Sequence, residues 1–352
     1  MAEVLRVIDF GSVTPLRSQT LWHAVAYGVS GGAPPTLTFA RPTAAYVCLG
    51  YHRGLDEVDQ EYCRAHGLPV YRRMVGGGPV YLDEGQLFFQ ICLPARAVPP
   101  SRLDALRTLL EPAVTAFRAA GIAAELDDDL EICLADRKIC GHGAGQIEDA
   151  VVVCGNLIER FDHQRATRVL ALGDPVLRTE TLRLMRRYVA ATPADAAVFQ
   201  AAMTEAYTSV LGLRAFPGDL TDGEHAAAAR LDAQFTSSDW LGGPARPPAR
   251  EAPAAGHPGP LQRVQHCRQV KVRAGVWTFA ARTDGAQVVA SVVRGKVARA
   301  RLSAIGLNGQ TRAAQRALAG VPLGSAPDVL ARLGTPGRQL AAAFAAADPR
   351  RL

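Results

Sequence analysis

Lysine is nearly absent from this sequence. Of the 39 basic residues among 352, only Lys138, Lys271 and Lys296 are lysines, and the other 36 are arginines. An ammonium is a compact point charge, which the planar, forked guanidinium of arginine does not reproduce. A surviving lysine therefore supports the interpretation that its position needs an ammonium, while chance survival of three lysines is the alternative.

Cysteine pairs and long apolar runs are also missing. The seven cysteines include no CxxC pair, a pattern typical of reduced thiols rather than of a disulfide framework or a zinc ribbon. No run reaches the ~18 apolar residues that span a membrane. Residues 1–15 lack the basic and apolar segments of a secretory leader. We expect a cytoplasmic protein without membrane contact.

Aromatic residues are few and the charge is only mildly positive. Aromatics make up 6% of the chain and form no stripe on which bases could stack, which argues against a nucleic-acid partner. Apolar residues make up 48% and charged residues 20%, so the chain has enough apolar surface for a sizeable core. The net charge of +6 favours anionic ligands such as nucleotides.

The length and the prolines predict the domain organisation. A chain of 352 residues suits one large domain and one smaller domain. Six prolines within residues 242–260 exclude a helix or a central strand there, so we predict a linker. The large domain then covers residues 1–241. Residues 261–352 contain four strand-like runs and two helical patterns, which predict a small α+β domain.

The large domain also mixes helices and strands. The apolar spacing predicts a helix within residues 56–66, a second helix from Ser101 to about Gly121, and helical structure over residues 179–214. Residues 130–134 and 151–158 are predicted strands, and residues 80–81 and 86–93 resemble a hairpin. The predicted class is α+β.

Two arginines and three glycines form the strongest local motif. Arg72 and Arg73 end a short extended run, and Gly76, Gly77 and Gly78 follow. Glycines let a backbone approach a ligand closely and aim N–H groups at an anion, while arginines neutralise phosphate. A flexible loop with solvated arginines is the alternative interpretation.

A second glycine-rich segment follows Lys138, over residues 141–145. It matches neither GxGxxG nor the P-loop order, and a turn beside an ordinary surface lysine is the alternative. Upstream, residues 127–129 are all aspartate and could hold Mg²⁺, although a solvated turn is the commoner structure. The nearby cysteines and His142 match no common zinc spacing, so core packing is favoured.

Together these segments resemble the lipoate–protein ligase family. That family has a Gly-[ILV]-Pro-Val strand followed by Arg-Arg-x-Ser-Gly-Gly-Gly-Ala-Val-Tyr-His-Asp, and residues 67–83 are similar to it. Residues 128–130 and 137–141 resemble the family's Asn-Asp-[IL] and Arg-Lys-[IV]-Ser-Gly blocks, and residues 155–157 resemble its His-Gly-Thr-Leu strand. Residues 261–352 resemble the accessory domain of the long bacterial ligases.

The resemblance implies a mixed α/β catalytic domain like that of biotin ligases and class II synthetases. It implies a two-step reaction, in which lipoate and ATP form lipoyl-adenylate and the lipoyl (or octanoyl) group then passes to a lysine of a carrier. The expected carriers are acyltransferase subunits of 2-oxoacid dehydrogenases, the glycine-cleavage H protein or a related protein. The expected cofactors are ATP and Mg²⁺, and no resident metal site is expected.

The resemblance also implies roles for particular residues. Lys138 would be catalytic, bridging the acyl carbonyl oxygen and the phosphate in both steps. Nucleotide or adenylate contacts would come from the first motif and from two later segments: Arg72, Arg73, Gly76, Gly77, Gly78, Pro79, Val80, Tyr81, Asp128, Asp129, Gly141 and Gly155.

Several family positions differ in this chain. Val75 replaces a serine, Pro79 an alanine, Leu82 a histidine, Cys140 a serine and Cys154 a histidine. These departures keep alternatives open: a cofactor-free octanoyltransferase of the same fold, acting through a cysteine thioester, or a non-catalytic relative that binds carrier or nucleotide. A biotin ligase is disfavoured, because its Gly-Arg-Gly-Arg loop is absent.

Overall fold

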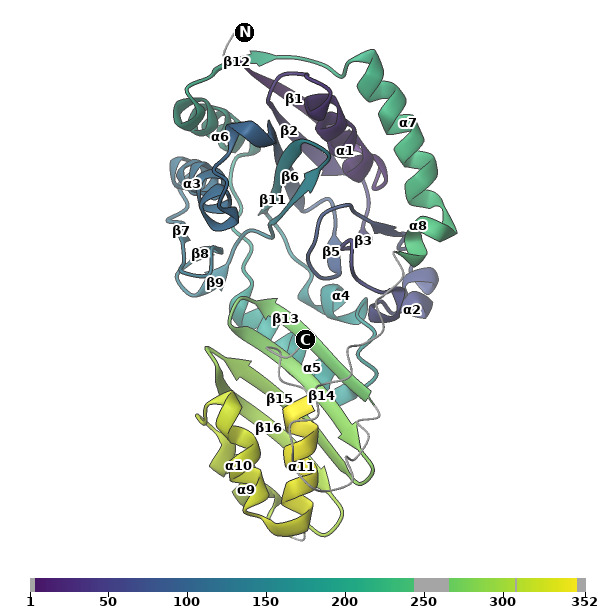
Figure 1. Cartoon of the computed structure of the whole chain (residues 1–352), viewed down its shortest axis with the longest axis vertical. Coiled ribbons are helices and arrows are strands. Elements are labelled where there is room, and N and C mark those ends of the chain that lie inside the picture. The colour runs from purple at the N-terminus through teal and green to yellow at the C-terminus, as the bar shows by residue number, and fades with distance from the viewer. Residues whose placement is uncertain (1–3, 244–265, 308, 347–352) are drawn as a thin grey trace. The chain divides into compact units, whose positions relative to one another are not determined.

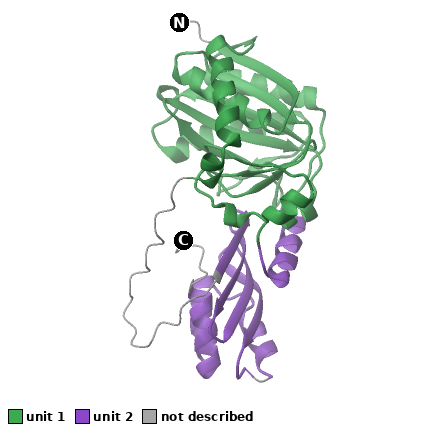
Figure 2. Cartoon of the chain, turned by 90° about the vertical axis from the view of Figure 1, so that its right-hand side faces the viewer, with its two compact units in different colours: residues 1–171, 189–246 green, residues 172–188, 247–352 purple. Residues whose placement is uncertain are grey.

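The computed structural model describes residues 4–243, 266–307 and 309–346. Contacts divide the chain into two units, residues 1–171 with 189–246 and residues 172–188 with 247–352 (Figure 2). The predicted domain of residues 1–241 is therefore interrupted by residues 172–188, which group with the C-terminal part. The predicted linker lies outside the described residues from residue 244 onward. Among the described helices, none is both long and apolar enough to cross a membrane.

A six-stranded mixed sheet forms the centre of unit 1, in the order β10-β11-β6-β2-β1-β12 (Figure 1). β1 runs parallel to both β2 and β12, and the other pairs are antiparallel. The strands are β1 (Val4–Val13), β2 (Thr36–Pro42), β6 (Gln86–Pro94), β10 (Gly143–Ile147), β11 (Ala150–Ile158) and β12 (Arg214–Pro217).

Helices cover both faces of this sheet. Side chains alternate along β6, so that Phe89 and Ile91 face one core and Cys92 faces the other. On the first face α3 (Arg102–Ala119) packs against α6 (Ala196–Leu211), and on the second α1 (Arg17–Ser30) packs against α7 (Asp222–Thr236). Because β6 is covered on both faces, all but its last residue are buried.

Two small sheets carry the motif segments. One has the order β4-β3-β5 and the other the order β7-β8-β9. The predicted hairpin of residues 80–93 is wrong, because β5 pairs with β3 and β6 pairs with β2 and β11. The strands are β3 (Tyr46–Leu49), β4 (Val70–Arg72), β5 (Val80–Leu82), β7 (Glu125–Leu126), β8 (Ile132–Leu134) and β9 (Arg137–Lys138).

The short helices of unit 1 lie mainly in its connections. The predicted helix within residues 56–66 is a 3₁₀ turn followed by α2, whose N-cap Asp59 accepts a hydrogen bond from the N–H of Tyr62 at 3.0 Å. These elements are η1 (Leu55–Glu57), α2 (Gln60–Ala65), η2 (Ala95–Ala97), α4 (His163–Arg168) and α8 (Ser238–Gly242).

Unit 2 is a four-stranded antiparallel sheet with helices. The strands β13 to β16 lie in sequence order, and α9, α10 and α11 pack around Phe279 on one face. The strands are β13 (His266–Arg273), β14 (Val276–Thr283), β15 (Ala286–Val293) and β16 (Lys296–Ala304), and the helical elements are α9 (Thr311–Leu318), η3 (Leu323–Ser325), α10 (Ala326–Ala331) and α11 (Gly334–Ala346). The four strands and two helices predicted for this part of the chain are present, and α11 is a further helix that was not predicted.

The helix α5 (Pro175–Tyr188) belongs to unit 2 although it is distant in sequence. It contacts β13, β14 and β15, and the Thr181 hydroxyl is 2.8 Å from that of Thr278. Because Thr278 alternates with Phe279 along β14, α5 covers the face opposite α9, α10 and α11. The helical prediction for residues 179–214 is therefore only partly right, since two helices and a strand in two units share that stretch.

A buried ion pair joins α7 to β1 of the central sheet. The guanidinium of Arg6 donates to both carboxylate oxygens of Glu224, and its Nε donates to the Thr36 hydroxyl at 3.0 Å. Both charged side chains are nearly inaccessible. Gly28 of α1 leaves the space, because a Cβ there would come within 2.1 Å of Glu224 Oε1. Full hydrogen bonding makes this buried pair tolerable.

His23 joins α1 to the segment that follows β4. Its ring is fully buried, Nε2 accepts the N–H of Met74 at 3.0 Å, and Nδ1 lies 2.7 Å from the carbonyl oxygen of Gln19. The Met74 donor assigns the proton to Nδ1. Burial lowers the pKa of His23 from 6.5 to about 3, so the folded protein holds it neutral.

The state of His23 predicts a pH dependence of stability. The unfolded chain takes up a proton near the ordinary pKa of 6.5 and the folded chain only near about 3. Stability from this group is therefore fully present above 6.5 and lost as the pH falls, at up to about 1.4 kcal/mol per pH unit. Denaturant unfolding between about pH 5 and pH 7 should show this slope, and His23→Gln should reduce it. Equal slopes in both proteins would contradict the assignment.

The packing of α5 predicts where a core substitution acts. Leu184 is 1% exposed and Val176 on the same helix is 43% exposed. Leu184→Ala should cost about 2–5 kcal/mol and lower hydrogen-exchange protection in β14 and β15, while Val176→Ala, the matched control, should have little effect. Loss of hydrogen-exchange protection in β6 instead would show that α5 packs with unit 1 and would contradict its assignment to unit 2.

Candidate functional site

Arg72 is a buried arginine that joins β4 to two other segments, residues 50–53 and helix α8. Its side chain is fully enclosed, and its guanidinium donates to five backbone carbonyl oxygens at 2.5–3.1 Å. These oxygens belong to Gly50, Tyr51, Arg53, Trp240 and Leu241. The resemblance predicts a ligand contact for Arg72, but every guanidinium nitrogen is already engaged with backbone, so its role here is to shape the site.

Arg73 organises the glycine loop from inside. Its Nη2 donates to the carbonyl oxygens of Gly76 at 2.8 Å and Gly78 at 3.1 Å, and Nη1 donates to that of Cys48 at 3.0 Å. In a trans peptide the N–H points opposite to the C=O. Because the Gly76 carbonyl faces Arg73, the Gly77 N–H faces away from the guanidinium, and such an outward N–H is suited to an anion.

Glycine is required at two positions of this loop region. Gly77 has a φ of +102°, and a Cβ there would lie 2.6 Å from Arg73 Nη2. A Cβ on Gly50 would lie 2.0 Å from the Gly77 carbonyl oxygen. The loop and the segment after β3 therefore touch through backbone alone, which explains part of the triple-glycine motif without a ligand.

The second glycine-rich segment is a strand rather than a turn. Gly143 and Gly145 lie in β10, which pairs with β11 at the edge of the central sheet. A Cβ on Gly145 would approach Val75 Cγ1 to 2.8 Å, and Gly143 faces Cys154 Sγ and Val75. Val75 is 1% exposed and packs with the α1 core. Gly143 and Gly145 therefore lie in a strand, where they make room for Val75, and not in the turn that was the alternative interpretation.

Lys138 ends β9 and forms an ion pair with Glu131. Its Nζ is 2.9 Å from Glu131 Oε1, and the two side chains are 19% and 5% exposed. The backbone is anchored as well, because the N–H of Ala190 donates to the Lys138 carbonyl at 2.9 Å and Val189 forms a parallel bridge with it. Sequence reasoning missed Glu131, because nothing in the motifs on either side of it indicates a role for that residue.

The aspartates before β8 form a turn. Asp127 accepts the N–H groups of Asp129 at 3.0 Å and Glu131 at 2.8 Å, while Asp128 and Asp129 are exposed. Among the described residues, the group that could hold a metal is Asp127, Glu131 and Cys133, whose ligand atoms lie within 4.8 Å. The Lys138 ammonium already supplies positive charge to this group. The exposed carboxylates present the hard oxygens that Mg²⁺ prefers.

The residues after the glycine loop lie partly in the interior. Val80 is 37% exposed and Tyr81 only 5%. Burial raises the pKa of Tyr81 to about 12, so its hydroxyl keeps its proton, and it hydrogen-bonds with Arg165 and Asp83. Pro79 carries no N–H and therefore offers no backbone donor to a ligand.

Gly141 and Gly155, the remaining glycines predicted for the site, both lie next to Asn156. The Gly141 N–H donates to Asn156 Oδ1 at 2.6 Å, and Asn156 Nδ2 donates to Gln86 Oε1 at 2.7 Å. Gly155 needs its small size, since a Cβ there would lie 2.4 Å from the Phe89 ring. Asn156 follows Gly155 directly, and only the tertiary structure shows that it fixes the segment after Lys138.

The cysteines near the site are poor thiolates. Cys140 is fully buried and burial raises its pKa to about 12. Burial also raises the pKa of Cys154, the partly exposed cysteine of β11. The thiolate is the nucleophilic form, so neither residue has the environment of an activated cysteine.

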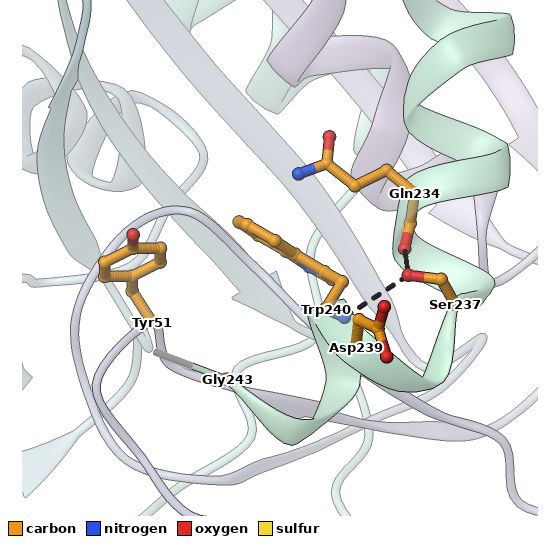
Figure 3. A pocket seen from close by; sticks show the side chains of 6 residues that line it. All are labelled: Tyr51, Gln234, Ser237, Asp239, Trp240 and Gly243. Atoms are coloured by element: carbon orange, nitrogen blue, oxygen red, sulfur yellow. Dashed lines mark hydrogen bonds between the residues drawn. The ribbon is translucent and has the colours of Figure 1, made fainter. Parts of the chain in front are cut away.

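An open cavity of about 380 Å³ lies beside Arg72. Figure 3 shows Tyr51 and Trp240 with their rings turned toward each other, and their centroids are 5.8 Å apart. The other lining residues are Gln234, Ser237, Asp239 and Gly243. A second cavity of about 230 Å³ lies along α2. Neither cavity is lined by Lys138 or by the glycine loop.

The arrangement as a whole offers cationic and N–H donors without an activated thiol. Lys138 supplies an ammonium, the outward Gly77 N–H supplies a backbone donor, and two internal arginines hold the loop. Such groups stabilise negative charge on phosphate or on a carbonyl oxygen. The site is therefore suited to chemistry on an anionic or acyl substrate.

Comparison with known proteins agrees with this chemistry. Residues 15–188 match the family described as lipoyl protein ligase A/B catalytic domain. Octanoyltransferase LipM of Moorella thermoacetica is 26% identical over 271 residues, which is 68% of this chain and 98% of LipM. Lipoate-protein ligase A subunit 1 of Thermoplasma acidophilum is 25% identical over 225 residues, 59% of this chain and 85% of that protein.

Solved structures agree on the fold. A bipartite lipoate protein ligase from Thermoplasma acidophilum has a TM-score of 0.61 at 23% identity and covers 69% of this chain and 97% of its own. LipL1 of P. falciparum, in complex with lipoate, has a TM-score of 0.53 at 11% identity and covers 94% of this chain and 93% of its own. The predicted α+β fold of lipoate ligases is confirmed. Residues 15–188 of this chain thus belong to the lipoyl protein ligase A/B catalytic domain family, and the relatives found by sequence are named as lipoate–protein ligases and octanoyltransferases.

Proposed function

We propose that this protein is an ATP-dependent lipoate–protein ligase. The carboxylate of lipoate (or octanoate) attacks the α-phosphorus of ATP, pyrophosphate leaves, and the acyl-adenylate forms. The amine of a carrier lysine then attacks the acyl carbonyl carbon and AMP leaves. The observation that supports this most is that the site offers the Lys138 ammonium, while burial raises the pKa of Cys140 and Cys154.

The residues divide into those that touch ligand and those that shape the site. In the proposal, Lys138 contacts the acyl carbonyl oxygen and a phosphate oxygen, and the Gly77 N–H contacts phosphate. Arg72 and Arg73 keep the loop in place through their backbone contacts. Mg²⁺, which binds through a few carboxylates and substrate phosphates, would neutralise ATP charge, and the exposed Asp128 and Asp129 are its proposed protein ligands.

The acyl acceptor is proposed to be a lipoyl carrier protein in the cytoplasm. The Thermoplasma acidophilum ligase was solved as part of a lipoylation system with its E2 lipoyl domain. By that likeness we extend the proposal to acyltransferase subunits of 2-oxoacid dehydrogenases, the glycine-cleavage H protein or a related carrier.

A cofactor-free octanoyltransferase is the second candidate. It is favoured by the LipM relative from Moorella thermoacetica, which the match covers over 98% of its length. That reaction would need a cysteine to form a thioester, and Cys140 or Cys154 would have to serve. The raised pKa values of both thiols in this chain argue for the ligase.

The ligase proposal predicts a strict requirement for ATP and for Lys138. Lys138→Ala should lower acyl-adenylate formation from lipoate or octanoate about 10²–10³-fold, because one preorganised charge is lost. Lys138→Arg should fail as well, because a planar fork does not replace a point charge. The assay is adenylate yield per folded enzyme, by mass spectrometry. Lys296→Arg in unit 2 is the control and should keep its activity.

Two results would count against this assignment. Wild-type turnover in Lys138→Arg would show that the lysine is an ordinary surface residue. Acylation of a carrier from an octanoyl thioester without ATP would favour the transferase.

The environment of the thiols gives a separate prediction. Cys140→Ala and Cys154→Ala should each keep ATP-dependent acylation of a carrier within about threefold, since a protonated thiol acts mainly as a small apolar group. Circular dichroism checks the fold of each variant. Loss of carrier acylation in either variant, with its fold intact, would make that cysteine a nucleophile.

A further inference from the structure

Glu131 is a buried carboxylate for which the motifs provide no role. It is 4% exposed and lies between the aspartate turn and β8. Its Oε1 is 2.9 Å from the ammonium of Lys138. The two side chains differ in exposure: that of Glu131 is 5% exposed and that of Lys138 is 19% exposed. The enclosed acid therefore holds an ammonium that still reaches the surface of the site.

The backbone before Glu131 is shaped to direct it toward Lys138. Asp127 Oδ1 accepts the N–H of Glu131 at 2.8 Å, and the N–H of Asp127 donates to the Glu131 carbonyl at 3.0 Å. Leu130 between them has a φ of +59°. The left-handed region is costly for a bulky side chain and persists where the surroundings over-determine it. This strained turn fixes the start of β8 and with it the Glu131 carboxylate.

We propose that Glu131 is a positioning residue for Lys138, an inference that rests on the proposed ligase function. An ammonium has three N–H donors. A charge-assisted bond to Glu131 uses one of them and leaves two for the acyl carbonyl oxygen and the phosphate oxygen. The flexible lysine stem is thereby oriented before substrate binds. Such preorganisation raises the rate, because the ordering of the catalytic group is not left to the reaction step. Arginine in place of Lys138 would present a different donor geometry to Glu131.

The scarcity of lysine allows a direct test of the ion pair in the full-length protein. Lys138, Lys271 and Lys296 can be followed separately by mass spectrometry after limited labelling with an amine-acylating reagent. In the wild type Lys138 should react about tenfold more slowly than the exposed Lys296, because its Nζ is hydrogen-bonded to Glu131 and its side chain is only 19% exposed. In Glu131→Gln the labelling of Lys138 should rise several-fold, with Lys271 and Lys296 unchanged. An unchanged Lys138 rate in this isosteric variant overturns the inference.

The second measurement separates positioning from a purely structural role. Glu131→Ala should lower kcat for adenylate formation about 10²-fold, with the KM values for ATP and for the acid changed less than about threefold. Glu131→Gln should recover part of the rate, since its amide oxygen still accepts a hydrogen bond. Glu125→Gln is the matched control, because Glu125 is exposed on β7 of the same small sheet.

The outcomes distinguish the two proposals. If the wild type makes adenylate and Glu131→Ala keeps its full kcat, the inference is overturned and the ligase function stands. If the wild type makes no adenylate from ATP and lipoate or octanoate, the ligase function fails and the inference fails with it. A loss confined to KM, or a loss equal in Glu125→Gln, would assign Glu131 a structural role.

Discussion

The site depends on two buried guanidinium groups that bind backbone. Arg72 and Arg73 follow each other in sequence, yet they contact different loops, so one pair of residues ties together the segments after β3, β4 and α7. Burying such a charge is costly unless its donors are satisfied. Here backbone carbonyl oxygens satisfy them, and the same bonds prevent the glycine loop from collapsing into another conformation.

The rest of the site is built around this fixed loop. His23 holds the Met74 N–H from the α1 side, and Val75 then fills the space left by the glycines of β10. Asn156 fixes the segment after Lys138 through the Gly141 N–H, and Glu131 holds the lysine itself. The polar contacts that fix Lys138 and the glycine loop thus come from α1, from β11 and from the residue that precedes β8.

Much of the fold was accessible from the sequence, but the pairing of its strands was not. Periodicity and caps locate α3, β11 and the strands of unit 2 within a few residues, because these are local properties. The hairpin of residues 80–93 was mistaken because a tight turn favours pairing of its neighbours, whereas β6 is buried on both faces and pairs inside the sheet with β11 and β2. Likewise, nothing local distinguishes α5 from α6, although they belong to different units.

By itself the sequence determined which chemical groups are present: one lysine in a glycine-rich setting, a pair of arginines, and no activated cysteine motif. The tertiary structure decided what each of them does. Arg72 resembles a phosphate ligand in sequence, but its guanidinium is enclosed by carbonyl oxygens. Glu131 resembles an ordinary strand residue, but a left-handed turn directs it to Lys138. Charge and residue type are local properties, whereas the partner that a buried charge finds depends on segments far apart in the chain.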